Sequence, residues 1–171
     1  MKQLDLISAP AAFQKMPSEP ILRSAEISGD MRWTLRRAWG AGPSILWCGL
    51  NPSKANGTRD DPTMLREIGF SYRWGFGSLV KVNIYPYITS DPAALHRWLR
   101  GNHGFWHENA QKVLAEIDRA DTLVAAWGNG VDPDQVDDFM VSLFWDRKKM
   151  PQWKCLGTNQ NGSPVHTLAR G

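Results

Sequence analysis

Short apolar runs alternate along the chain with stretches of helical periodicity. Four runs, stopped by Gly, Pro or Asn, predict buried strands over residues 45–50, 79–84, 122–127 and 153–157. Helices are predicted between them, over residues 62–72, from 91 onwards, over 105–119 and around 136–144. This order predicts a three-layer αβα fold of the α/β class, in which a central, mainly parallel four-stranded sheet carries helices on both faces.

The N-terminal part of the chain does not follow this alternation. Residues 1–20 contain three prolines and no clear period, which predicts a loosely packed arm. Apolar segments at 21–27 and 31–39 flank Ser28-Gly29-Asp30 and predict a hairpin. Its arginines, Arg32, Arg36 and Arg37, alternate with apolar and aromatic residues. That pattern fits a nucleic-acid contact or, as we favour, a solvated sheet edge.

Composition and charge narrow the class of protein. The 171 residues, 42% of them hydrophobic, suit one domain over residues 1–171, which at this size buries roughly 70% of its unfolded surface. The net charge of +3 permits a polyanionic partner without requiring one. We find no apolar run of the roughly 20 residues that a membrane span needs and no secretion signal, so we expect a cytoplasmic protein. Cys48 and Cys155 lie in apolar runs and are expected to be reduced core thiols.

Several well-known chemical motifs are missing from the sequence. It has no P-loop, no Gly-x-Gly-x-x-Gly after a strand, no Cys-x-x-Cys pair and no Gly-x-Ser-x-Gly elbow. His103 and His107 have the spacing of metal ligands on a helix, but glycines interrupt them and no His-Glu-x-x-His motif is formed. We therefore expect neither a metal nor a cofactor.

Polar or aromatic residues follow the ends of the predicted strands. Asn51 follows the first strand, Asn83 lies in the second near its end, and His166 lies near the end of the chain. Each of them alone is explained by turn capping or by a bond to a backbone carbonyl. Because the carboxyl ends of parallel strands share one edge of a sheet, we expect these three side chains to converge on one pocket.

Five short segments, in this order, resemble motifs of the uracil-DNA glycosylase superfamily: Gly49-Leu50-Asn51-Pro52-Ser53, Phe70-Ser71, Val82-Asn83-Ile84, Trp127-Gly128 and Pro164-Val165-His166. This resemblance is remote. A more specific one runs from about Met31 to the C-terminus, through Asn-Pro-Ser, Asp-Pro-Thr, the Val-Asn strand and the Ala-Trp-Gly strand. It is to a bacterial and phage family known only as a domain of unknown function.

The glycosylase resemblance implies roles for matching residues. Asn51 would position the attacking water, and His166 would stabilise the departing base anion. Phe70 would stack on an extruded base and Asn83 would bind its edge, in a pocket that includes Gly49 and Leu50. The expected DNA phosphate contacts are Ser53, Lys54, Arg59 and Arg66.

The sequence departs from the glycosylase pattern in three places. The last motif reads His166-Thr167-Leu168 instead of His-Pro-Ser, and the loop that enters the DNA minor groove is expected to be missing or supplied from elsewhere. The interval from Asn51 to Phe70 is longer than in the uracil enzymes and contains Asp60-Asp61-Pro62-Thr63. Asp61 either caps the helix, which we favour, or takes over activation of the water. The enlarged loop indicates a substrate bulkier than uracil.

We therefore expect a monomeric DNA glycosylase that hydrolyses the N-glycosidic bond of a flipped-out, modified base. Base excision repair and defence against phage DNA both fit this activity. Two alternatives stay open, because a fold does not determine a function. One is a hydrolase of free nucleotides or nucleosides, and the other is a non-catalytic nucleic-acid-binding module of the same fold.

Overall fold

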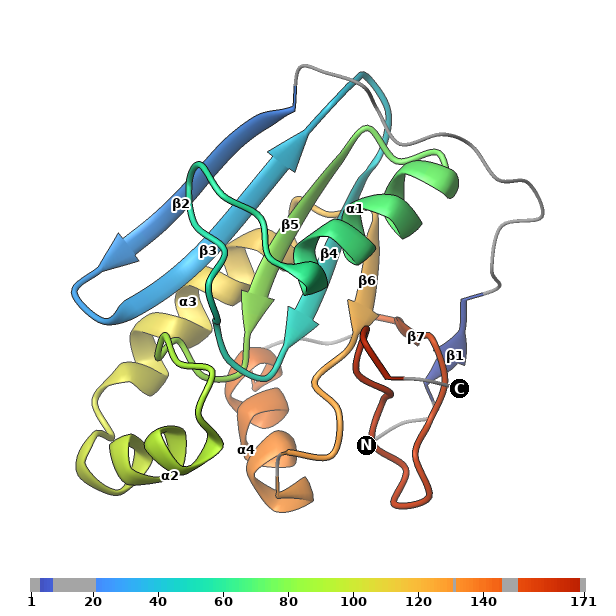
Figure 1. The fold of residues 1–171 in the computed structure, drawn as a ribbon. Helices are drawn as coiled ribbons and strands as arrows, with labels where there is room; N and C mark the ends of the chain where they lie inside the picture. The colour runs from blue at the N-terminus through green and yellow to red at the C-terminus, as the bar shows by residue number, and fades with distance from the viewer. Residues whose placement is uncertain (1–3, 8–20, 131, 146–150, 170–171) are drawn as a thin grey trace.

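The computed structural model describes residues 4–7, 21–130, 132–145 and 151–169, and within them one mixed sheet of seven strands. Figure 1 shows the sheet, whose strand order is β1-β7-β6-β4-β5-β3-β2. The strands are β1 Asp5–Leu6, β2 Leu22–Ser28, β3 Met31–Ala38, β4 Ser44–Gly49, β5 Ser78–Asn83, β6 Thr122–Ala125 and β7 Trp153–Cys155. The first five in the spatial order are parallel, and β3 and β2 continue the sheet in antiparallel fashion.

The four predicted strands are confirmed as β4, β5, β6 and β7, but the sheet is larger and less uniform than expected. The predicted hairpin is confirmed as β2–β3, and it extends the sheet by pairing with the outer edge of β5. Residues 5 and 6, expected in a loose arm, form β1 and pair with β7. Both additions cover strand edges whose backbone groups would otherwise be unpaired. Residues 8–20 of the expected arm lie outside the described part of the chain.

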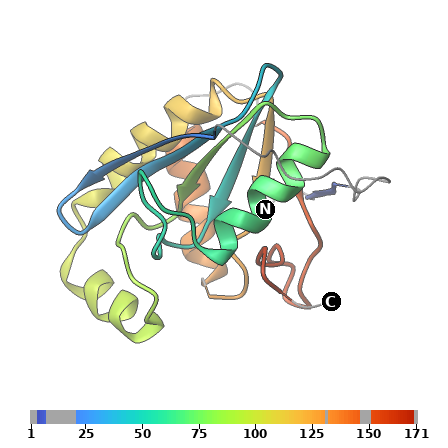
Figure 2. The same ribbon diagram turned by 45° about the horizontal axis from the view of Figure 1, so that its top comes forward.

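Helices cover both faces of the sheet, as the alternation predicts. Figures 1 and 2 show α1 on one face and α3 and α4 on the other, while α2 lies beyond the edge at which the parallel strands end. The helices are α1 Pro62–Arg73, α2 Pro92–Gly101, α3 Phe105–Ile117 and α4 Pro133–Phe144. Asp61, Asp91 and Asp132 each precede a proline, and their side chains accept a backbone N–H of the first turn. The predicted cap Asp61 is thus confirmed, and Asp91 caps the helix predicted from residue 91 onwards.

The alternation of side chains along β4 divides the core into two layers. Ile45 and Trp47 pack with residues of α1, whereas Leu46 and Cys48 face the cluster formed with α3 and α4. Cys48 and Cys155 are buried and free, as predicted. Burial raises the pKa of the Cys48 thiol to about 12, which leaves it an unreactive core residue.

A bulge in β3 determines where its arginines point. Glu26 pairs with Thr34 but Ile27 pairs with Arg32, so Trp33 is an extra residue between them. In a regular strand Arg32 and Arg37 would face opposite sides, because their separation is odd.

The extra residue brings both guanidinium groups to the α1 side. There Arg32 Nη1 donates to the carbonyl of Ala55 at 2.7 Å and Arg37 Nη2 to that of Asn56 at 2.8 Å. The predicted solvated edge is wrong for these two residues, which are 2% and 0% exposed. Arg36, on the other face, pairs with Glu116 of α3 at 2.6 Å.

Candidate active site

A cavity of about 340 Å³ opens at the edge where β4, β5 and β6 end. Its walls come from these strand ends, the start of α1, the turn that leads into α2 and the C-terminal segment, which Figure 1 draws in red beside the end of β6. The lining residues are Arg32, Gly49, Leu50, Asn51, Ser53, Asp61, Thr63, Met64, Lys81, Asn83, Thr89, Ser90, Asp91, Pro92, Leu95, His96, Trp127, Gly130 and His166. Asn51, Asn83 and His166 therefore converge on one cavity, as their places at strand ends predict.

Asn83 presents an unpaired amide to this cavity. It is the last residue of β5 and is 1% exposed, yet its Nδ2 and Oδ1 have no hydrogen-bond partner in the described part of the chain. The backbone beneath is fixed, since Asn109 Nδ2 donates to the carbonyl of Asn83 at 3.1 Å and to that of Ile84 at 2.8 Å. A buried polar group without a partner costs about 1–3 kcal/mol, so such an amide is typical of a ligand contact.

Asn51 is held by its amide nitrogen. Nδ2 donates to the carbonyls of Pro52 at 3.1 Å, Tyr87 at 3.3 Å and Thr89 at 2.8 Å. These bonds fasten the turn after β5 to the end of β4 and fix the orientation of the side chain. The amide oxygen, which makes none of these bonds, is left to accept from a water or a ligand.

His166 is neutral and has a defined tautomer. Its Nδ1 accepts a hydrogen bond from the backbone N–H of Leu168 at 3.1 Å, so the ring proton is on Nε2. Burial and the nearby Lys81 ammonium lower the pKa of His166 below its ordinary value of 6.5. Gly128 permits the close approach of the His166 backbone and Cβ, because its φ is 76° and a Cβ there would lie 3.1 Å from His166 Cβ.

A buried ion pair, which the sequence analysis missed, lies beside these residues. Lys81 lines the cavity and pairs with Oε1 of Glu67, a residue of α1 that is fully buried. The same oxygen accepts a hydrogen bond from Thr167 Oγ1 at 2.9 Å, so the pair reaches the neighbour of His166. The sequence does contain an indication of this ion pair. Lys81 is a charged residue among the apolar residues Leu79, Val80 and Val82 of a predicted buried strand.

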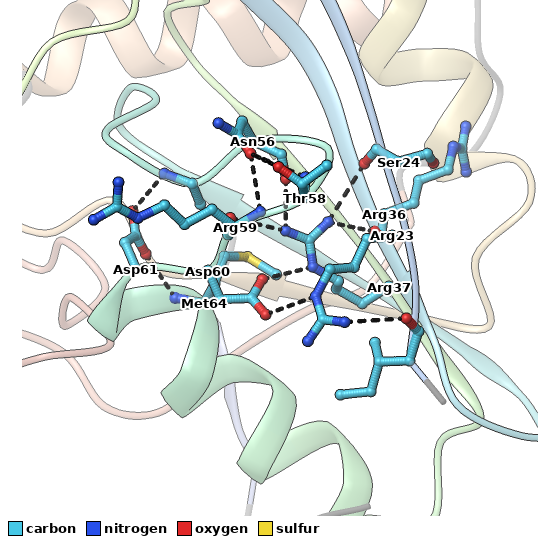
Figure 3. Close-up of polar contacts among 12 residues, drawn as sticks. Arg23, Ser24, Arg36, Arg37, Asn56, Thr58, Arg59, Asp60, Asp61 and Met64 are labelled. Atoms are coloured by element: carbon cyan, nitrogen blue, oxygen red, sulfur yellow. Dashed lines mark hydrogen bonds and ion pairs between the residues drawn. The ribbon is translucent and has the colours of Figure 1, made fainter. Parts of the chain in front are cut away.

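The loop between β4 and α1 lines the cavity with Ser53 and Asp61, and Figure 3 shows the polar contacts that fix it. Asp60 receives Arg37 Nε at 2.6 Å and Arg23 Nε at 3.1 Å. Arg37 Nη2 also donates to the carbonyl of Arg59 at 3.3 Å. Asn56 Oδ1 accepts the backbone N–H of Thr58 and of Arg59, each at 2.9 Å, and closes the turn. We name residues 53–61 the wall loop.

Asp61 belongs to this wall as a helix cap. Its Oδ1 accepts the backbone N–H of Met64 at 2.9 Å and its Oδ2 that of Ala55 at 3.3 Å. Both oxygens are thus engaged, although the residue lines the cavity. The geometry favours the cap over a water-activating carboxylate.

The expected base-stacking residue, Phe70, does not line the cavity. Its ring packs against Trp47 and Trp74, with centroid distances of 6.3 and 5.3 Å. The guanidinium groups of Arg66 and Arg73 lie 5.8 and 5.1 Å from its centroid. This position in the α1 layer corrects the prediction that Phe70 contacts a base in this cavity.

The remaining predicted residues separate into two groups. Gly49, Leu50 and Ser53 line the cavity. Lys54 and Arg59 are exposed on the wall loop, and Arg66 is exposed on α1. Trp127 is an aromatic lining residue that the sequence analysis placed at a strand end without assigning it a contact.

The described residues contain no group of three or more His, Cys, Asp or Glu side chains placed to hold a metal ion. None of the helices in the described part of the chain is long and apolar enough to cross a membrane.

Fold and cavity together define an α/β protein with a ligand-sized polar site at its parallel strand ends. Residues 32–168 match the family described as Protein of unknown function (DUF1643), and the chain belongs to this family. This confirms the more specific of the two resemblances. No curated protein and no solved structure gives a significant match. The similarity to the uracil-DNA glycosylase superfamily stays a prediction.

Proposed function

We propose that the protein is a DNA glycosylase that hydrolyses the N-glycosidic bond of an extruded base. The observation that carries this proposal is the unpaired amide of Asn83, 1% exposed, in the same cavity as Asn51 and His166. A flipped base offers adjacent donors and acceptors on its edge, which an amide can satisfy in pairs. The cavity volume of about 340 Å³ is within the range of small-ligand sites.

His166 would stabilise the leaving group in this reaction. When the bond between C1′ and the base nitrogen breaks, the base keeps the electron pair and becomes an anion. The neutral His166, with its proton on Nε2, is a donor that lines the cavity. One such donor is typically worth about 3 kcal/mol of transition-state stabilisation.

Asn51 would orient the attacking water. Its nitrogen is held by three backbone carbonyls, which leaves the oxygen to accept a hydrogen bond from the water without taking its proton. Weak activation suffices when the sugar is already cation-like; the water then adds to C1′, and the proton it loses passes to the departing base anion, which leaves as the neutral base. We assign the stacking contact with the base to Trp127 instead of Phe70, because Trp127 lines the cavity. Ser53 lines the cavity, and Lys54 and Arg59 are exposed on the same wall loop, where they would contact phosphates beside the extruded base.

The test is base release from a panel of DNAs. Purified protein is incubated with duplex and single-stranded DNA containing uracil, bulky modified pyrimidines or phage-type modified bases, and alkali converts abasic sites to strand breaks. We expect breaks with at least one substrate and at least about 100-fold slower release by Asn83→Leu. The free energy of unfolding of this variant should stay unchanged or rise, because a buried unpaired amide is removed.

Asn102→Ala, at an exposed asparagine beyond the cavity, is the control and should behave as wild type. No breaks across the panel would overturn the proposal. Release from free nucleosides but from no DNA would support the free-nucleoside alternative instead.

A further inference from the structure

Two polar side chains meet at the floor of the cavity, beside Gly49. A Cβ placed on Gly49 would lie 2.9 Å from Asn83 Oδ1 and 3.2 Å from Lys81 Nζ. The two groups therefore approach one point, and the glycine leaves that point unfilled. A planar ligand entering the cavity there can touch both of them.

Lys81 is fixed in place and keeps unused donors. Its side chain is 7% exposed and its ammonium group pairs with Glu67 Oε1. This bond uses one of three N–H donors, and an ammonium group has no acceptor. Because Thr167 binds the same carboxylate oxygen, Glu67 is itself held from a second side.

The charge of Lys81 also orients the amide of Asn83. The carboxamide has no hydrogen-bond partner in the described residues that would choose between its two orientations. A positive charge near one end favours the orientation in which the oxygen lies on that side. In this orientation the protein presents three groups in order: the Lys81 ammonium as a donor, Asn83 Oδ1 as an acceptor and Asn83 Nδ2 as a second donor.

We propose that Lys81 is a specificity-determining residue that, with Asn83, selects heterocycles carrying an oxo group beside a ring N–H. Lys81 donates to the oxo group, Asn83 Oδ1 accepts the ring N–H, and Nδ2 donates to a further acceptor where the ring has one. An amino group in place of the oxo group would face the Lys81 ammonium with donor against donor. The inference rests on the proposed function in one respect, namely that the cavity receives a base.

Asn83 without Lys81 cannot make this distinction. A free carboxamide can rotate by 180° and present its donor and acceptor in the reverse order, which suits an amino group beside a bare ring nitrogen equally well. Lys81 removes this freedom, because its donors and charge are the same in every rotamer. Rejection through an unpaired buried donor is usually stronger than selection through one added contact.

The experiment measures binding of free heterocycles, without any reaction. Ligand-observed NMR is recorded with uracil against cytosine and with hypoxanthine against adenine, up to about 10 mM, which detects millimolar affinities. We expect wild-type protein to bind the oxo member of each pair at least about 10-fold more tightly. Lys81→Met should bring both members of a pair to within about 3-fold of each other, because the Asn83 amide can then rotate.

Variants at neighbouring positions separate specificity from folding. Lys81→Met leaves Glu67 without its cation, so Lys81→Met with Glu67→Gln is measured beside it; glutamine keeps an oxygen to accept from Thr167. The double variant should lose the same selectivity. Lys112→Met, which removes a partly exposed cation of α3 that pairs with Glu26 of β2 and does not line the cavity, should keep it.

Either of two results would overturn the assignment: no binding of any heterocycle, or an oxo preference that survives in both Lys81 variants. Failure of the proposed function gives a different result. A protein that selects oxo heterocycles but releases no base from DNA would refute glycosylase activity and leave the role of Lys81 intact.

Discussion

Three asparagines near the cavity illustrate how one residue type serves different ends. The amide of Asn109 bonds two backbone carbonyls and fixes the end of β5. Asn51 bonds three carbonyls through its nitrogen and holds a turn. The side-chain amide of Asn83 has no hydrogen-bond partner within the described residues. The sequence pattern singled out Asn51 and Asn83 as equivalent strand-end residues, and their hydrogen bonds distinguish a partly structural amide from one left for a ligand.

The neutral state of His166 predicts a pH dependence. Burial and Lys81 lower its pKa below 6.5 in the folded protein, so the unfolded chain takes up a proton first as the pH falls. The free energy of unfolding therefore falls as the pH drops below 6.5 and continues to fall down to the folded-state pKa of His166. Protonation at Nδ1 also breaks the hydrogen bond that the ring accepts from the backbone N–H of Leu168. Base release should fall as the pH passes through the folded-state pKa of His166, because the protonated ring loses its fixed position.

The measurement is an NMR titration of the His166 ring, followed by the pH profile of base release. We expect a midpoint below 6.5 and an acid limb in the activity profile with the same midpoint. His166→Asn should lose that limb together with most of the activity. A midpoint at or above 6.5 would contradict the assigned environment.

At the scale of elements, the wall loop depends on a strand that is not its neighbour in sequence. Arg37 of β3 is fully buried and binds both the carboxylate of Asp60 and two loop carbonyls. Arg37→Met should cost about 3 kcal/mol of unfolding free energy, because Asp60 would keep only the half-buried Arg23. Urea unfolding measures this cost, and limited proteolysis should show faster cleavage within residues 53–61.

Lys112→Met is the matched control for this prediction. It removes a cation from the surface pair with Glu26, which joins β2 to α3. Surface pairs contribute little, so unfolding and proteolysis should resemble wild type. Equal behaviour of the two variants would show that Arg37 does not hold the loop.

The elements differ in how well their sequence predicts them. Asp61-Pro62 and Asp91-Pro92 fix helix starts through local chemistry, and both are confirmed. Phe70 was placed by motif order, but its half-buried ring packs against Trp47 and Trp74 in the α1 layer, with the guanidinium groups of Arg66 and Arg73 over it. The burial of Arg32 and Arg37 was not predictable, because a bulge leaves no mark in the alternation of residues. Local signals therefore predict elements, while tertiary contacts decide which side chains reach the site.

At the scale of the molecule, strand order places the cavity. From β4 the chain passes through α1 to β5 on one side, then through α2 and α3 to β6 on the other side of β4. Strand order thus reverses at β4, and open α/β sheets bind ligands at such a point. The sequence predicted convergence at the carboxyl edge. It could not give the order of the strands, which depends on pairing between distant segments.

One side chain links the C-terminal segment to α1. Thr167 Oγ1 donates to Glu67, a hydrogen bond across 100 positions of sequence. Thr167→Val should cost about 1 kcal/mol of unfolding free energy and increase hydrogen exchange at Leu168 and Ala169. Thr58→Val, which removes an exposed hydroxyl of the wall loop, is the control and should leave exchange there unchanged.

The single extra residue at Trp33 makes the length of β3 part of the site. Deleting it would restore regular alternation, turn Arg32 toward the layer of α3 and α4, and remove one of the two guanidinium groups from the wall loop. Arg32 and Arg37 are an odd number of positions apart and still reach the same side of the sheet, because the strand is irregular. A related chain that uses both arginines in this way must therefore keep the bulge or separate them by an even number of positions.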